Sequence, residues 1–512
     1  MTRFWPRFIL LAGSAITLLP GHAAARADDA TLCNGSNHLA RIDACTRLMG
    51  AKGSTRDDQF RALINRAVAH FKRDEHRAAI RDFTLAITAG YGTAAIHESR
   101  GLAFLAVEDH ERALADFDKS IALDPSRISA YGNRGLTHAA LGQLDAALAD
   151  YDKVIARDDK VVVAFNNRAN VYRRKGDLAR ALADLDRAVS LAPDDPTLLR
   201  NRGITHLLGK NHEQAKADLD RAVALAPTYA GAYASRAELH RTMDRLDLAL
   251  ADLDRALALN PREVSALNAR GIIHAARDET ERAMHDFSRS VALNDRDARS
   301  WFNRGRLLLG MGQFEAALAD FERAIALDPQ NAEAVMMRGE ARLKLGHTHL
   351  AISDLTLAID IDGQLHAARN DRAVALFILG EQDAALADLD TVLKAAPDDP
   401  RALTLRCRYR GLAGRQLEAA LADCDAALAA GSPNTNRLSN RGIVKLRLGR
   451  LEEAMADLDA AIAADPGNAE AIHARALVMR SLGRLAQANH EFASARRLQP
   501  DVGSFFEEHG IR

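Results

Sequence analysis

The sequence ALADLDRA occupies Ala181–Ala188, and the same eight residues recur unchanged at Ala249–Ala256. The two copies begin 68 residues apart (249 − 181), which is twice 34. A fixed period of this kind is typical of a duplicated structural unit. At each step of 34 residues an Arg precedes a small residue. The sequence therefore predicts a repeat architecture.

The Arg-small pair recurs thirteen times between Arg66 and Arg475. One step, from Arg406 to Arg441, is 35 residues long, with the extra residue between Gly411 and Gln416. Each repeat also carries an Ala on its second half, and eight repeats close with Pro. The arginines are Arg66, Arg100, Arg134, Arg168, Arg202, Arg236, Arg270, Arg304, Arg338, Arg372, Arg406, Arg441 and Arg475.

Each repeat reads as two helices packed antiparallel. The small residue on the first helix and the Ala on the second allow close approach of the backbones, and large apolar residues at helical spacing fill the space beside them. Pro ends the second helix because it lacks an amide donor. Aromatic residues make up only 5% of the chain, which argues against a sheet protein. An all-α fold follows, stacked because one pair cannot bury its apolar face.

The repeat resembles the tetratricopeptide repeat. The matching residues in two of the repeats are Tyr131, Gly135, Ala147, Tyr151 and Val154, and Trp301, Gly305, Ala317, Phe321, Ala324 and Pro329. The resemblance implies a solenoid, a right-handed superhelix of antiparallel helix pairs. We expect thirteen repeats over residues 60–502, preceded by a capping segment at 28–59 and followed by a tail at 503–512. Phe505 and Phe506 in the tail should shield the last helix.

The N-terminus differs in kind from the repeats. Basic Arg3 and Arg7 flank the apolar run Phe8–Leu19, and Ala25-Arg26-Ala27 offers an A-x-A cleavage site. This pattern predicts a signal peptide at 1–27 and a periplasmic or secreted protein. An uncleaved anchor is the alternative, although twelve apolar residues are too few to span a bilayer. After cleavage we expect no membrane insertion.

In an exported protein the four cysteines can form disulfides, because the compartment is oxidising. A Cys33–Cys45 bridge would strap the segment before the capping helix, Ser36–Gly50, to that helix. Cys407 takes the small position of a first helix and Cys424 the large apolar position of the second, and antiparallel packing brings these positions together. A disulfide is expected there, with two small buried hydrophobes as the alternative.

An acid follows every repeat arginine by sixteen residues, or by seventeen in the longer repeat. This matching predicts a structural ion pair between a first and a second helix, in the same or a neighbouring repeat, because a half-buried guanidinium needs a carboxylate to offset its desolvation. An anion-binding row of arginines is the alternative. The acids are Asp82, Asp116, Asp150, Asp184, Asp218, Asp252, Asp286, Asp320, Asp354, Asp388, Asp423, Asp457 and Glu491.

The residue before the repeat arginine is Asn in six repeats, including Asn133, Asn167, Asn201 and Asn303. This row resembles the asparagine ladder in the repeat region of O-linked N-acetylglucosamine transferase, where amides hold an extended peptide backbone. A primary amide suits this role because it both donates and accepts hydrogen bonds. The row predicts binding of protein or extended peptide segments; local capping or solvent contact is the alternative.

A denser polar cluster surrounds the fourth repeat. We expect its side chains to face inward and to hold acidic side chains or a C-terminal carboxylate, although Asn166 stands where the carboxylate clamp of chaperone-binding repeats has lysine. The cluster consists of Asn166, Asn167, Asn170, Arg173, Arg174, Arg200 and Asn201.

No phosphate loop, nucleophile elbow or metal-spaced cysteine motif is found in the sequence. His70, His138, His206, His240 and His274 share one repeat position and read as core residues with one hydrogen-bonded nitrogen. With 68 basic and 69 acidic residues, the charge balance does not favour nucleic acid. We therefore expect no enzyme, cofactor or metal, but a protein-binding scaffold; the alternative is a regulatory or adaptor subunit of an envelope assembly or of an enzyme on another chain.

Overall fold

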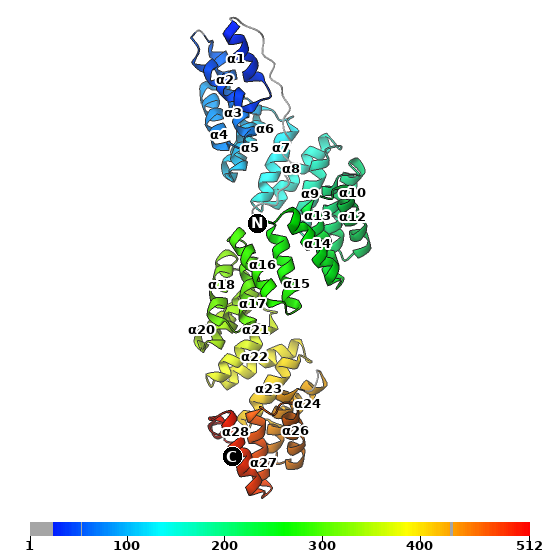
Figure 1. Ribbon diagram of the computed structural model, residues 1–512, viewed down its shortest axis with the longest axis vertical. Coiled ribbons are helices and arrows are strands. Elements are labelled where there is room, and N and C mark those ends of the chain that lie inside the picture. Colours follow the sequence, from blue (N-terminus) through cyan, green and yellow to red (C-terminus); the bar gives the residue numbers. More distant parts are fainter. Residues whose placement is uncertain (1–23, 53, 431–433, 512) are drawn as a thin grey trace. The chain divides into compact units, whose positions relative to one another are not determined.

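The computed structural model describes residues 24–52, 54–430 and 434–511. These residues form helices joined by short turns, with no strand in the described ranges, so the predicted all-α class is confirmed (Figure 1). A short π-helical turn, η1 (Ile87–Tyr91), extends α4. The predicted signal sequence lies outside the described residues except for its last four, with which α1 begins.

In chain order the helices are α1 (Ala24–Asn34), α2 (His38–Gly50), α3 (Arg56–Lys72), α4 (His76–Ala86), α5 (Ala94–Ala106), α6 (His110–Leu123), α7 (Ile128–Ala140), α8 (Leu144–Arg157), α9 (Val162–Arg174), α10 (Leu178–Leu191), α11 (Pro196–Leu208), α12 (His212–Leu225), α13 (Ala230–Thr242), α14 (Leu246–Leu259), α15 (Val264–Ala276), α16 (Thr280–Leu293), α17 (Ala298–Gly310), α18 (Phe314–Leu327), α19 (Ala332–Lys344), α20 (Thr348–Ile361), α21 (His366–Ile378), α22 (Gln382–Ala395), α23 (Pro400–Ala413), α24 (Leu417–Ala429), α25 (Thr435–Arg447), α26 (Leu451–Ala464), α27 (Ala469–Ser481), α28 (Leu485–Leu498) and α29 (Val502–Glu508).

From α3 to α28 the helices form thirteen pairs, one for each repeat of the sequence. Odd-numbered helices are the first helices and even-numbered ones the second helices. The small residue of the first helix packs against a large one of the second: a Cβ on Gly101 would lie 2.8 Å from Phe117, and one on Gly305 2.8 Å from Phe321. Close helix contact therefore explains the Gly and Ala at this position.

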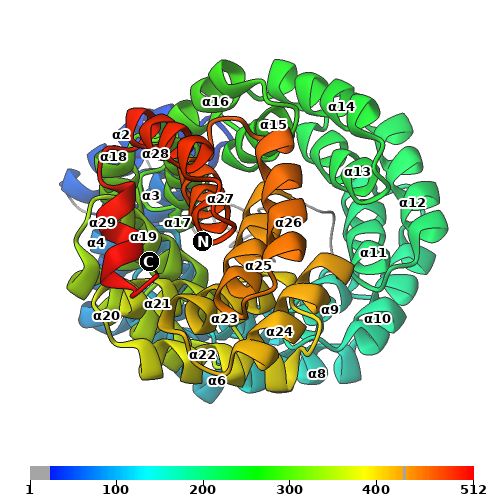
Figure 2. The ribbon, with the colours of Figure 1, turned by 90° about the horizontal axis from the view of Figure 1, so that it is seen from below.

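The chain divides into two compact units, one ending at Ala266 and one beginning at Leu267, with the division inside α15. Within each unit, successive first helices touch one another, as α7 and α9 do in the first unit and α19 and α21 in the second. Successive second helices make no comparable contact in the described ranges. The first helices thus form the inner face of each unit, as Figure 2 shows for α11 and α13 inside α12 and α14.

All thirteen predicted arginine–acid pairs are formed, each within one repeat, at donor–acceptor distances of 2.6–3.2 Å. Twelve arginines engage both carboxylate oxygens, whereas Arg475 engages one oxygen of Glu491. The prediction of a structural ion pair is confirmed, and these arginines do not form a free anion-binding row.

Both expected disulfides are present. Cys33 and Cys45 have Cα atoms 4.9 Å apart, and Cys407 and Cys424 have Cα atoms 5.2 Å apart. The first joins α1 to α2, and the second joins the two helices of the longer repeat.

The N-terminal segment differs from the expectation of one helix with a strap. The residues before α2 form a helix of their own, α1, which packs on α2 and α3. The sequence pattern missed it because only the second helix of this pair carries a regular apolar side. At the other end, α29 packs on α27 and α28, and Phe506 is fully buried, as expected of a cap.

Candidate binding site on the inner face

The inner face is where the predicted amide row should meet a ligand, but the structure buries much of that row. Asn133 is 2% exposed and donates through Nδ2 to Glu98 on the preceding first helix, 3.1 Å away. Glu98 is 1% exposed and also accepts from Arg127. The expected open amide at Asn133 is therefore replaced by a closed network between repeats.

The same holds two repeats later. Asn201 is 5% exposed and its Nδ2 donates to Asn166 Oδ1 at 2.8 Å, while Asn166 is itself 1% exposed. Asn167 is half-buried beside it and accepts a long hydrogen bond of 3.4 Å from Asn166. Hydrogen bonds of these amides join neighbouring first helices. The side chains of Asn133, Asn166 and Asn201 are therefore not exposed to a ligand, which corrects the expectation from the sequence.

The arginines of the predicted cluster behave differently from one another. Arg200 donates to Gly231 O and Ser235 Oγ on the next first helix, and Arg174 donates to Ala139 O on the preceding one. Arg173 donates to Asn170 Oδ1 at 2.8 Å, but its Nη1 is buried without a hydrogen-bond partner. Burial and the nearby charge of Arg200 lower the pKa of Arg173 to about 10. Among the described residues no acid pairs with these three arginines.

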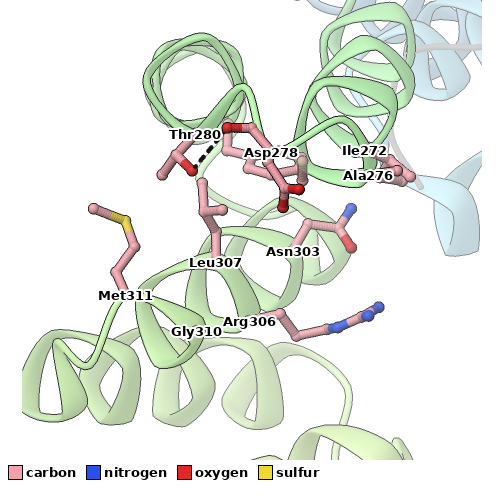
Figure 3. Close-up of a pocket in the computed structure, with 11 residues that line it drawn as sticks. Ile272, Ala276, Asp278, Thr280, Asn303, Arg306, Leu307, Gly310 and Met311 are labelled. Atoms are coloured by element: carbon pink, nitrogen blue, oxygen red, sulfur yellow. Dashed lines mark hydrogen bonds between the residues drawn. The ribbon is translucent and has the colours of Figure 1, made fainter.

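Asn303 belongs to the same row, but its side-chain amide makes no hydrogen bond within the described residues. It lines a pocket of about 450 Å³ between α15 and α17, shown in Figure 3. Ile272, Leu307 and Met311 form part of its apolar lining, and Ile272 and Met311 are 41% and 43% exposed. The volume falls within the usual range for ligand pockets.

Asp278 and Arg306 line the pocket with Asn303, and in Figure 3 the three polar side chains project into the space between the two helices. Within the described ranges, the Asp278 carboxylate and the Asn303 amide make no hydrogen bond or ion pair, and Arg306 makes no ion pair. The pocket thus presents an anion and an amide without hydrogen-bond partners, and a cation whose guanidinium lies 5.6 Å from the centroid of the Phe302 ring, beside apolar carbon.

Sequence analysis missed Asp278, Arg306 and Ile272. One signal was available: Arg306 and Ile272 occupy the position directly after the small residue of their first helices, next to the Asn row. Asp278 lies in the turn between α15 and α16, and its φ of 58° places it in the left-handed region.

Three of the five histidines at the shared repeat position have a local hydrogen-bond partner. Nδ1 of His70, His138 and His274 lies 2.5–2.7 Å from Glu75, Gln143 and Glu279, respectively. Nδ1 of His206 and of His240 is buried without a partner. No group of three or more metal-ligating side chains occurs among the described residues. None of the described helices is both long and apolar enough to cross a membrane.

Comparison with known proteins agrees with this geometry. Four tetratricopeptide repeat models match the chain, over residues 64–128 and 235–300, 100–164 and 169–246, 298–331, and 438–468. No curated protein matches the sequence.

Among solved structures, a chain of the crystal structure of the APC/C hetero-tetramer Cut9-Hcn1 is 15% identical with a TM-score of 0.51, covering 91% of this chain and 98% of that one. A tetratricopeptide repeat protein from Parabacteroides merdae is 19% identical, with a TM-score of 0.42 and coverage of 48% and 98%. PilF of Pseudomonas aeruginosa is 21% identical, with a TM-score of 0.38 and coverage of 40% and 94%. The likeness to the Cut9-Hcn1 chain concerns the fold alone. The matching repeat models, which fit the thirteen helix pairs, show that the chain belongs to the tetratricopeptide repeat family.

Proposed function

We propose that this protein is an exported, non-catalytic scaffold that holds a segment of another polypeptide against the inner face of its first helices. The observation that carries the proposal is the pocket of Asn303, which is lined by an amide and a carboxylate without hydrogen-bond partners in the described part of the chain, by the guanidinium of Arg306 and by apolar side chains. Tetratricopeptide repeats generally mediate protein–protein interactions, which supports the same reading.

The chemistry of the pocket suits an extended peptide. Asn303 can donate to a peptide C=O and accept from a peptide N–H, as the backbone of an extended segment offers both. The apolar floor takes one large apolar side chain of the segment. Asp278 and Arg306 at the rim favour a basic residue on one side of that side chain and an acidic residue on the other.

The guanidinium of Arg173 is a second candidate contact, which a ligand would reach only if the side chains that bury its Nη1 moved aside. Its Nη1 lacks an acceptor, so a carboxylate that reached it would remove an unsatisfied buried donor. An acidic hexapeptide should bind the protein, and Arg173→Gln should weaken that binding by roughly tenfold in calorimetry. Equal affinity of the variant would remove Arg173 from the site.

The basic start, the apolar run and Ala25-Arg26-Ala27 support export, and two disulfides are typical of proteins in oxidising compartments. N-terminal sequencing of the protein recovered from a periplasmic or culture fraction should give Asp28 as the first residue. A chain that begins at Met1 and stays with the cytosol would contradict this part of the proposal.

Site-specific photo-cross-linking in intact cells tests the pocket. A photoreactive residue at Ile272, 41% exposed beside Asn303, should capture a polypeptide, whereas one at Leu357, 44% exposed on the second helix α20, should not. Equal capture at both positions would argue against the pocket as the binding site.

The captured segment, made as a peptide, then allows a binding measurement. Asn303→Ala should weaken binding by about tenfold, since it removes two hydrogen bonds of about 0.5–1.5 kcal/mol each. The matched control is Asn133→Ala at the equivalent repeat position, where the amide is buried against Glu98. This control should lower the melting temperature and leave peptide affinity unchanged. Unaltered binding by the double variant Asn303→Ala, Arg306→Ala would overturn the proposal.

A further inference from the structure

The C-terminal segment does more than cover the last repeat. Residues 502–511 comprise α29 and the turn that follows it, and Val502, Phe506 and Ile511 are at most 4% exposed. Their hydrophobic cluster includes Leu412 of α23 and Phe377 of α21, which precede the last repeat by two and three repeats. The segment therefore extends back along the inner face.

Named contacts hold the end of the segment there. The His509 ring stacks on Phe377 with centroids 5.9 Å apart, and Phe377 stacks on Tyr409 at 3.9 Å. Arg447 donates through Nη2 to the carbonyl oxygen of His509, just beyond the end of α29, and to Leu412 O at 2.9 Å. Burial lowers the pKa of Arg447, so this guanidinium depends on such acceptors.

A cation is placed over an aromatic ring at the other edge. Arg408 lies 5.6 Å from the centroid of Phe505 and is held in position by Glu470, which accepts from both terminal nitrogens at 2.8 and 2.9 Å. Phe505 meets Phe506 edge-on, with centroids 5.6 Å apart. The two adjacent phenylalanines thus make different contacts: Phe506 packs in the core, and Phe505 packs against Arg408.

The positions that receive the segment are those that line the Asn303 pocket. Arg408 stands directly after the small residue of its repeat, as Arg306 and Ile272 do, and Leu412 and Arg447 stand five residues after it, as Gly310 and Ala276 do. The molecule therefore contains one example of a polypeptide segment bound to its own inner face.

This segment depends on the surface that it covers. A helix of seven residues is unstable alone in water, so α29 owes its form to the surface beneath it. It follows the last second helix after a short turn, and it is a small unit whose local opening costs less than unfolding a whole repeat. Its tether gives it a high effective concentration, which an outside competitor must exceed.

We propose that the surface formed by Phe377, Arg408, Tyr409 and Arg447, the tail-binding surface, docks a short amphipathic helix with two adjacent aromatic residues from a partner protein, and that residues 502–511 occupy it until the partner displaces them. The partner helix should offer the same groups as the tail. These are two adjacent aromatic residues, a ring that stacks on Phe377 and a backbone carbonyl that accepts a hydrogen bond from Arg447. The proposal does not depend on the Asn303 pocket.

The test uses the full-length protein and a fluorescent peptide of residues 500–511. By fluorescence anisotropy, a full-length variant with a weakened tail, Phe505→Ala with His509→Ala, should bind the peptide at least tenfold more tightly than the unaltered protein. Adding Phe377→Ala or Arg447→Gln to that variant should abolish the gain, because both residues belong to the tail-binding surface. A peptide with both phenylalanines replaced by Ala should not bind.

Two results would overturn the proposal. One is equal peptide affinity of the tail-weakened variant and the unaltered protein. The other, which needs no variant, is hydrogen exchange in residues 502–511 as slow as in α26, since a tail that never opens is a permanent cap. Asn303→Ala should leave peptide binding unchanged, so failure here and failure of the pocket proposal remain distinguishable.

Discussion

Two aspartates in the first copy of the octapeptide bind arginines of different repeats. In the first copy Asp184 binds Arg168 of its own repeat, whereas Asp186, two residues later, binds Arg202 of the next repeat at 2.9 Å. Equivalent contacts to the preceding repeat are made by Arg134, Arg168, Arg236, Arg406, Arg441 and Arg475. One guanidinium thus ties together the two helices of its repeat and the repeat before it.

Arg202→Leu should therefore destabilise α11 and its neighbours. The Arg202 side chain keeps 21% of its surface exposed and its partner Asp218 9%, so we expect about 2–3 kcal/mol, at the low end for a broken buried pair. The expected readout is a lower melting temperature with faster hydrogen exchange in α11 and α12. Arg255→Leu, an exposed arginine of α14, is the control and should change neither. An unchanged melting temperature of Arg202→Leu would contradict a structural role.

His473 makes the C-terminal end sensitive to pH. Burial, aided by the charges of Arg496 and Arg480, lowers the pKa of His473 to about 4, and the ring packs between Phe492 and Phe506. The unfolded chain has the ordinary value near 6.5, so between these values it binds a proton that the folded state does not. Stability should fall as the pH drops through this window, by up to about 2 kcal/mol from pH 8 to pH 5.

The measurement compares melting temperatures at pH 8 and pH 5. His473→Gln removes the titrating group, so the variant should lose less stability than the unaltered protein when the pH is lowered. Identical pH dependence in the two proteins would show that His473 does not supply the effect.

At the scale of elements, the turn between the two helices of a repeat needs one left-handed residue. Glycines provide it in several repeats, including Gly142 and Gly176, but Lys210 and Glu108 stand there with φ of 60° and 63°. An L-residue with a side chain adopts this conformation at a cost of about 1–2 kcal/mol. The turn geometry is thus set by the helix pair and imposed on whichever residue occupies it.

Lys210→Gly should relieve this strain and stabilise the α11–α12 turn by about 0.5–1 kcal/mol. The gain is smaller than the strain itself, because the greater freedom of glycine in the unfolded chain offsets part of it. The opposite change, Gly176→Ala in the preceding turn, should destabilise by a similar amount. Melting temperatures that move in opposite directions would support this account. A lower melting temperature for Lys210→Gly would refute it.

At the scale of the whole molecule, repeats stabilise only their neighbours, so local damage should stay local. The two disulfides lie far apart in sequence, one joining α1 to α2 and the other α23 to α24. Reduction should speed hydrogen exchange in those two pairs and leave the repeats from α7 to α18 unaltered. Exchange that rises throughout the chain after reduction would show a longer-range cooperativity than stacking provides.

The sequence by itself determined the features that repeat every 34 residues, which are the thirteen helix pairs, the small residue at the close contact of each pair and the arginine–acid pairs. It also determined the partners of the four cysteines. These follow from residues close in sequence, whose packing inside one pair is fixed by helix geometry. Only the tertiary structure decided which inner side chains are free. Asn133 and Asn303 share one repeat position, but Glu98 covers the first and the second lines a pocket. The approach of successive first helices depends on the bulk and charge of side chains from neighbouring repeats, so position in the repeat cannot specify exposure. The contact of His509 with Phe377 could not be predicted from the sequence for the same reason. It joins a tail that occurs once in the chain to a surface made by several repeats.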